Sequence, residues 1–245
     1  MRNTFLTTSL SIAASLLLMG CNSVQEQQET NASTAVQVVG AMKNVMWKGE
    51  LGGTINLDTI GNKQHLYGLG PVEYLAGELL IVDGKSYKST VLTDTTMLVE
   101  ETFEVKAPFF VYAHVRGWRE ITPPDSVQTL QQLEAYLNKT TQTSKRPFAF
   151  RVEGEVEQAT IHIVNLPEGS KVSSPTEAHQ GQVDYSLKDK QVQVVGFFST
   201  EHKAVFTHHD TFLHMHLMTD DKTQMGHLDE VVFKQGKVKL YLPAE

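Results

Sequence analysis

The chain of 245 residues has little cysteine: Cys21 is the single one. One cysteine excludes an intramolecular disulfide and a thiolate cluster, so any metal site must be built from histidine and carboxylate side chains. A basic stripe is also missing, because the 21 lysines and arginines are scattered and the formal net charge is −7. A nucleic-acid partner is therefore not expected.

Long hydrophobic runs are absent too. After Arg2, residues 10–19 form an apolar run that is too short for a permanent transmembrane helix and suits a signal peptide. It ends Leu18-Met19-Gly20-Cys21, which resembles the lipobox of bacterial lipoproteins. We expect residues 1–21 to direct export and a lipid on Cys21 to anchor the protein to the membrane of the cell envelope. A plain secretory signal with an incidental cysteine is the alternative.

The remaining sequence divides into a tether and a folded domain. Residues 22–35 are polar and rich in glutamine and glutamate, a composition that cannot bury a core. Residues 36–245 are predicted to form one domain, long enough for a sizeable core.

Within this domain the pattern is rich in strands. Apolar residues 79–82 and the return segment 85–87 flank Asp83-Gly84, a strong hairpin signal. Further strands are predicted at 109–114, 148–152, 160–164, 191–195, 231–233 and 238–242, with turns at Glu153-Gly154 and Gln235-Gly236 and a loop over 165–182.

One helix is clear. After Pro123-Pro124, Asp125 or Ser126 can cap a helix with one apolar face, formed by Val127, Leu130, Leu133 and Leu137. The prediction is a sheet-dominated α+β fold with two packed β-rich halves and one or two helices.

Five of the ten histidines lie between His208 and His227. On a strand over residues 211–218, His214 and His216 share one face, and a turn at 219–222 can return His227 beside them. Three imidazoles with an open position are typical of a catalytic zinc site. A chance pair on a surface strand is the alternative. His208 and His209 are adjacent and poorer joint ligands, so we expect them to be solvated or to support the ligands from outside.

Several sequence blocks then resemble the acetolactate decarboxylase family. The blocks Gly196–His202, His214–His216, Thr219–Asp221 and Gly226–Asp229 resemble its G-F-x-T-P-x-H, H-x-H, T-D-D and G-G-H-L-x-D motifs. Upstream, Gly68–Gly70, Leu75–Leu79, Ala107–Phe109 and Arg151–Gly154 resemble its G-x-G, L-D-G-E, T-P-F and R-I-D-G landmarks. The blocks are collinear from about Val39 to Leu242.

This resemblance implies the fold, a Zn²⁺ ion on His214, His216 and His227, and decarboxylation of 2-acetolactate to acetoin without an organic cofactor. It also implies an active-site role for Glu78, which from the pattern alone is a solvated hairpin-edge carboxylate. The substrate would be a small 2-hydroxy-3-keto acid. Zinc would stabilise the developing charge as a Lewis acid, and Glu78 could deliver the proton. A homodimer is possible.

Two departures from the family pattern affect this assignment. His162 stands where the family has an active-site arginine, and it lacks a permanent charge. It can protonate the intermediate, ligate the metal, or be a half-buried strand histidine with a hydrogen bond; Arg151 or Arg116 can in principle replace the charge. Family members continue to a further active-site glutamate beyond the position of Glu245. The alternative function is therefore an exported lipoprotein of the same fold that binds zinc or a small ligand with altered or lost activity.

Overall fold

The computed structural model describes residues 1–2 and 35–244. Cys21, the apolar run of the predicted signal peptide, nearly all of the predicted tether (22–35) and Glu245 lie outside the described residues. Among the helices of the described part, none is long and apolar enough to span a membrane. All strands and helices named below belong to one compact unit, Ser33–Glu245.

The first half of the domain is an antiparallel six-stranded sheet. Its strands, in spatial order, are β1 (Gln37–Val39), β8 (Phe110–His114), β3 (Leu66–Pro71), β4 (Glu78–Val82), β5 (Lys85–Thr93) and β6 (Thr96–Glu101). The hairpin predicted at Asp83-Gly84 is confirmed as the β4–β5 connection. Beside this sheet lie the short pair β2 (Ile55–Asn56) and β7 (Lys106–Ala107) and two single-turn 3₁₀ helices, Leu57–Thr59 and Glu73–Leu75.

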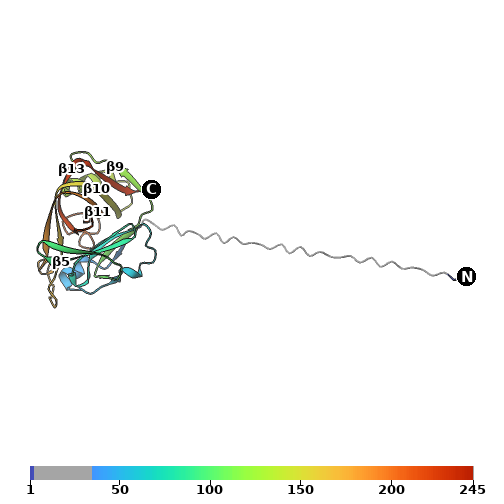
Figure 1. Cartoon of the computed structure of the whole chain (residues 1–245), viewed down its shortest axis with the longest axis horizontal. Coiled ribbons are helices and arrows are strands. Elements are labelled where there is room, and N and C mark those ends of the chain that lie inside the picture. The colour runs from blue at the N-terminus through green and yellow to red at the C-terminus, as the bar shows by residue number, and fades with distance from the viewer. Residues whose placement is uncertain (3–34, 245) are drawn as a thin grey trace. The chain divides into compact units, whose positions relative to one another are not determined.

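The second half is a five-stranded sheet made largely of long strands (Figure 1). These are β10 (Phe148–Ile163), β11 (Val183–Phe198), β12 (Leu213–Thr219), β13 (Met225–Pro243) and β9 (Trp118–Ile121). β10 pairs with β11 on one side and with β13 on the other, and β12 pairs with both β11 and β13. The four long partners therefore close on themselves, which leaves none of them as a bare edge.

Two predicted turns are wrong, because β10 and β13 each run continuously through them. Gly154 has φ +148° and lies so close to β13 that an added Cβ would be 2.1 Å from the Lys237 carbonyl oxygen. The β10–β13 register shifts between Gly154 and Val156, and Gly236 lies in the extra length that β13 carries there. The glycines thus mark an irregularity inside paired strands, which local sequence cannot distinguish from a turn.

A second irregularity lies at the other end of the same pair. Thr160 pairs with Glu230 and Ile161 with Leu228, so Asp229 is an extra residue on β13 without a pairing partner on β10. The next pair in this ladder is His162 with His227.

The helices differ in detail from the prediction. α2 (Leu130–Thr140) begins later than expected, because Thr129 and Gln132 form a reciprocal capping box instead of a cap at Asp125 or Ser126. α1 (Met42–Lys48) was not predicted, and the short α3 (Pro175–Ala178) lies inside the predicted loop. The fold has three α-helices in the described residues where one or two were expected.

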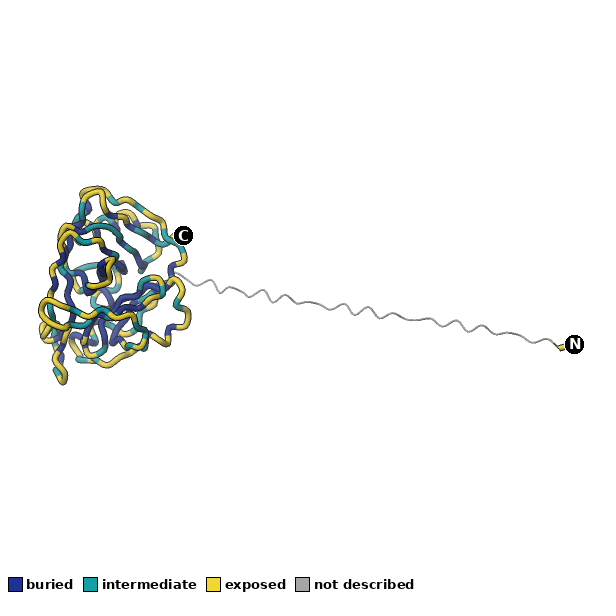
Figure 2. The backbone as a smooth tube through the Cα atoms, in the orientation of Figure 1, coloured by how far each residue is buried: buried dark blue, intermediate teal, exposed yellow. Residues whose placement is uncertain are grey.

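Both halves contain long buried stretches of chain, dark blue in Figure 2, and one hydrophobic cluster takes residues from both sheets. On β4, Leu80 joins the cluster shared with the second sheet, together with Val195 and Phe197, whereas Leu79 and Ile81 pack on the opposite side. Since side chains alternate along a strand, Glu78 shares the face of Leu80. The two sheets therefore meet along a buried seam, and Glu78 faces it.

Candidate metal centre

Three histidines from three neighbouring strands lie side by side at this seam. His162 of β10 pairs with His227 of β13, and His227 pairs in turn with His216 of β12. Their ring centroids are 4.6 Å (His162–His227) and 5.5 Å (His216–His227) apart. Cross-strand neighbours project on the same face, so the pairing itself assembles the row.

His214 completes the predicted triad. It lies two residues before His216 on β12, and its ring centroid is 5.2 Å from those of both His216 and His227. The predicted strand, the turn after Thr219 and the return of His227 beside the pair are all confirmed. Leu213, Met215 and Leu217 alternate with the histidines and pack into the core on the other face.

A close backbone approach explains the glycine before His227. A Cβ on Gly226 would lie 2.5 Å from the carbonyl oxygen of His162. A larger residue would push β13 away from β10 and separate the rings of His162 and His227.

Two members of the triad, His214 and His216, have ring nitrogens that make no hydrogen bond of ordinary geometry within the described chain. His216 is completely buried, and within the described chain neither of its ring nitrogens has a hydrogen-bond partner; nor does Nδ1 of His214. Burial, followed by the neighbouring histidines, holds the pKa of His214 and of His216 well below the usual value. Burial therefore favours the neutral form of both rings, which is the form that binds a metal ion. Buried unpaired nitrogens are costly, and a metal ion would satisfy them, so the residues fit a metal.

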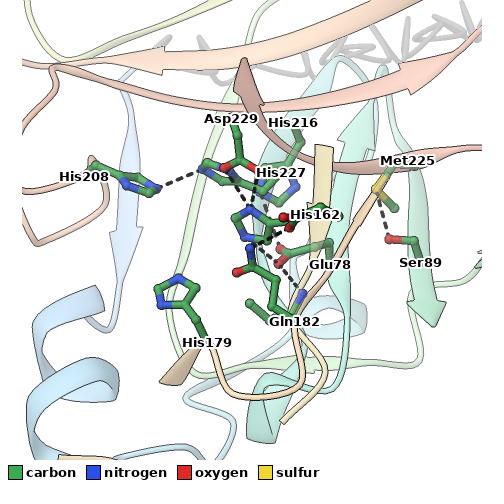
Figure 3. Close-up of polar contacts among 12 residues, drawn as sticks. Glu78, Ser89, His162, His179, Gln182, His208, His216, Met225, His227 and Asp229 are labelled. Atoms are coloured by element: carbon green, nitrogen blue, oxygen red, sulfur yellow. Dashed lines mark hydrogen bonds and ion pairs between the residues drawn. The ribbon is translucent and has the colours of Figure 1, made fainter. Parts of the chain in front are cut away.

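Asp229 contacts two members of the row, and the sequence analysis gave it no role. Its carboxylate accepts hydrogen bonds from Nδ1 of His162 at 2.8 and 2.9 Å and from Nδ1 of His227 at 3.2 Å (Figure 3). Partial burial would raise the pKa of Asp229, but the two histidines outweigh it and lower that pKa. Among the described residues, the group whose ligand atoms all lie within 4.8 Å of one another is His162, His227 and Asp229, so this cluster could itself hold a metal ion. The spacing of Asp229 two residues after His227 on a strand is the signal that could have identified it.

Glu78 lies inside the seam, so the solvated-edge interpretation of this residue is wrong. It is 3% exposed, its Oε1 accepts a hydrogen bond from the Val164 N–H, and its Oε2 lies 3.6 Å from Nε2 of His216. Burial raises the pKa of Glu78 to about 8, against the opposing charge of His162. The sequence block shared with the family was the only signal for this position.

His162 is fully buried rather than half-buried. Its Nδ1 bonds Asp229, and its Nε2 points toward Glu78, 3.9 Å from Oε1. Burial would lower the pKa of His162, but the hydrogen bond and charge of Asp229 outweigh it and raise that pKa. The contact with Asp229 leaves Nε2 as the atom that faces the centre.

His208 also belongs to the centre, which fits the expectation that it supports the ligands from outside and not the expectation that it is solvated; His209 is exposed, as one of the two alternatives expected. Nε2 of His208 lies 3.0 Å from Nε2 of His227, and burial lowers the pKa of His208 to about 3. The residues on either side of His208 form a loop between β11 and β12, so no strand periodicity could have revealed this contact.

Two cavities are lined by histidines of the centre. One of about 80 Å³ is lined by Glu78, His162 and apolar side chains, among them Met42, Met46 and Phe109. The other, of about 370 Å³, is more polar and includes Gln131, Glu134 and Asp210. His208, His214 and His227 line both.

Neither cavity is lined by a lysine or arginine from the described residues. Arg151, one candidate for the missing cation, pairs instead with Glu153 and packs within 5.1–5.6 Å of three aromatic rings, those of Tyr67, Trp118 and Tyr241.

Fold and site together define a sheet-dominated α+β protein with a buried histidine and carboxylate cluster able to hold a metal ion. The family model for alpha-acetolactate decarboxylase matches residues 37–242, and the chain belongs to this family.

Individual relatives agree with this assignment. The chain is 25% identical over 201 residues to the alpha-acetolactate decarboxylase of Brevibacillus brevis, covering 80% of this chain and 66% of that one. It is 24% identical over 210 residues to that of Lactococcus lactis, covering 82% and 80%. The crystal structure of acetolactate decarboxylase from Bacillus subtilis subspecies spizizenii superposes with a TM-score of 0.70 at 19% identity, covering 86% of each chain.

Proposed function

We propose that the protein decarboxylates 2-acetolactate, or a close 2-hydroxy-3-keto acid, using a Zn²⁺ ion held by His214, His216 and His227. The observation that carries this proposal is the buried triad, whose centroids lie 5.2–5.5 Å apart, with unused ring nitrogens on His214 and His216 and with Glu78 opposite. Zinc fits better than a harder cation because the donors are imidazoles. Family membership across nearly the whole domain supports the reaction.

The reaction breaks one carbon–carbon bond. The carboxylate leaves as CO₂, and its bonding electron pair stays on the hydroxyl-bearing carbon, delocalised into the neighbouring ketone. A proton must then be added to that carbon to give the hydroxyketone. Zinc, when bound, supplies a Lewis acid for the ketone and hydroxyl oxygens.

Glu78 is the residue best placed to hold that proton. Its carboxyl group is buried opposite His216 and lies in the small apolar cavity, where bulk water has little access. The Val164 N–H fixes one oxygen, which leaves the other directed toward the triad. A positioned acid of this kind typically contributes about 10²–10⁴-fold to a rate.

In this proposal, His162 makes a polar contact with the substrate from the position where the family has arginine. Asp229 orients the ring so that Nε2 faces Glu78. This nitrogen can hydrogen-bond a substrate oxygen but cannot form the bidentate clamp of a guanidinium. Since no lysine or arginine from the described residues lines the cavities, we expect weaker binding of the substrate carboxylate than an arginine would give.

We also propose that the protein is exported and anchored by a lipid on Cys21. The support is the sequence pattern Leu18-Met19-Gly20-Cys21 after a short apolar run. Metabolic labelling with a fatty-acid probe should label the protein, and a Cys21→Ser variant should be unlabelled; equal labelling of both would contradict the anchor.

The enzymatic proposal is tested with the purified full chain. Racemic acetolactate should yield acetoin, the yield should fall after zinc is removed with a chelator, and it should return when zinc is restored. His216→Ala should lose both metal and activity, whereas His65→Asn, which changes an exposed histidine paired with Asp83, should lose neither.

Two outcomes separate the alternatives. Stoichiometric zinc with no acetoin would reject the decarboxylase and leave the alternative, a protein of the same fold that binds zinc or a small ligand. Absence of bound metal in the wild-type chain, or normal metal binding by His216→Ala, would reject the metal centre itself.

A further inference from the structure

His208 gives this site an imidazole beyond those of His162 and the triad, and neither the triad prediction nor the family blocks contain it. Its Nε2 is 3.0 Å from Nε2 of His227, and its ring centroid is 4.8 Å from that of His227 and 6.2 Å from that of His214 (Figure 3). All three residues line both cavities at the centre. His208 therefore borders both cavities.

Hydrogen bonding shows which nitrogen lone pair His208 meets. The Asp229 carboxylate can only accept, so Nδ1 of His227 is the protonated donor to it. Nε2 of His227 then carries the lone pair, and Nε2–H of His208 donates to it. His208 thus occupies the lone pair through which His227 would bind a metal ion.

The separation of these two nitrogens matches joint ligation. Two imidazole nitrogens bound to one tetrahedral ion at about 2.0–2.1 Å are about 3.3 Å apart. The observed 3.0 Å is close to this value. A small rearrangement, with the proton lost from Nε2 of His208 and one gained at its Nδ1 from solvent, would let both nitrogens face the same ion.

We propose that His208 is the fourth imidazole ligand of the metal in the substrate-free protein. The inference rests on the proposed metal centre. His208 lies between β11 and β12, outside the strands that carry His214, His216 and His227. It can therefore leave the ion without disturbing the triad, and the substrate oxygens would take its place. Four ligands close a zinc site and three leave it open, so His208 closes the site until substrate arrives.

The test measures metal binding rather than turnover. Zinc affinity of the full chain is determined by competition with a chromogenic chelator, for wild type, His208→Ala, His208→Gln and His209→Ala. Glutamine can still donate a hydrogen bond to His227 but is a poor zinc ligand, and His209 is an exposed neighbouring histidine. We expect both His208 variants to bind zinc about tenfold or more weakly, and His209→Ala to match wild type.

Cobalt substitution supplies the second readout. With Co²⁺ in place of zinc, wild type should show the intense visible absorption of four-coordinate Co²⁺. His208→Gln should show bands at shifted wavelengths because water replaces an imidazole, and weaker bands where more than one water enters and the ion becomes five- or six-coordinate. Circular dichroism checks that each variant is folded. If His208→Ala does not fold, the test is made with His208→Gln alone.

The outcomes are distinct from those of the enzymatic proposal. Wild-type affinity and an unchanged cobalt spectrum in both His208 variants would overturn the inference while leaving the triad and the decarboxylase intact. A wild-type chain that binds no metal would overturn both. Weaker zinc binding in the His208 variants together with no acetoin from wild type would support the inference and reject the decarboxylase.

Discussion

Replacing Asp229 by asparagine removes the carboxylate that holds two histidines of the row. Asp229 accepts from Nδ1 of His162 at 2.8 and 2.9 Å and from Nδ1 of His227 at 3.2 Å. An asparagine side chain has one accepting oxygen and one donating NH₂ group. It can accept from one ring, but its NH₂ group meets the N–H of the other, so one of the two rings must turn or change tautomer.

The expected result is a loss of zinc affinity of about 10- to 100-fold, the usual effect of removing a carboxylate that orients a ligating histidine. This corresponds to about 1.4–2.7 kcal/mol of binding free energy. Most of the loss arises at His227, because His162 is not in the triad. Zinc dissociation constants are measured by chelator competition at constant pH and ionic strength.

Asp184→Asn is the matched control. Asp184 is the partner of His162 on β11, yet it is exposed and bonds Gln182 instead. This variant tests whether a negative charge near His162 is enough to maintain the zinc affinity without the hydrogen bonds that Asp229 accepts. An Asp229→Asn protein with wild-type affinity, or an equal loss in both variants, would show that the hydrogen bonds to His162 and His227 do not orient the centre.

Three further predictions concern catalysis and the fold. Glu78→Gln should lower kcat for acetolactate by about 10²–10⁴-fold while zinc remains bound. Glu100→Gln, which changes an exposed glutamate, should leave kcat unchanged. Loss of metal from the Glu78 variant would refute a purely catalytic role. Gly154→Ala should lower the free energy of unfolding by about 2–4 kcal/mol, because the φ of Gly154 is +148° and the added Cβ would lie 2.1 Å from the opposing strand. Urea denaturation compares this variant with Gly61→Ala, where the added Cβ meets no atom within 4 Å. Equal stability of the two variants would contradict the clash. Thr129→Ala should lower the free energy of unfolding by about 0.5–2 kcal/mol, because it removes the cap of α2, and Thr129→Ser should retain most of the wild-type stability. An alanine variant as stable as wild type in the same urea assay would rule out a stabilising cap.

The triad was predictable from sequence because its geometry is local. His214 and His216 share a face by strand alternation, and a turn of a few residues returns His227 opposite His216. Each step follows from strand geometry and a short connection. The β4–β5 hairpin was predictable for the same reason.

The rest of the centre depends on contacts between distant parts of the chain. His162 meets His227 only because β10 pairs with β13, and Glu78 meets His216 only because the two sheets pack together. His208 lies in a loop whose path no periodicity describes. Single-sequence patterns carry no information on which strands pair over such distances, so the family blocks alone pointed to Glu78.

The predicted breaks in β10 and β13 failed for another reason. Glycine is frequent both in turns and in strand irregularities, and Gly154 lies at an irregularity inside a paired strand. The choice between them is made by the partner strand, which continues past the glycine.

The extra residue on β13 has a consequence for transplanting or redesigning this centre. Between the pair Thr160–Glu230 and the pair His162–His227, β10 contains one residue and β13 contains two. If Asp229 were kept but paired in step with Ile161, Leu228 would take the place of His227 beside His162, and an apolar side chain would replace an imidazole of the row. A scaffold that receives Asp229 together with the histidines must therefore receive the unequal count as well. Deletion of Asp229 would equalise the count and keep His227 beside His162, but it would remove the carboxylate.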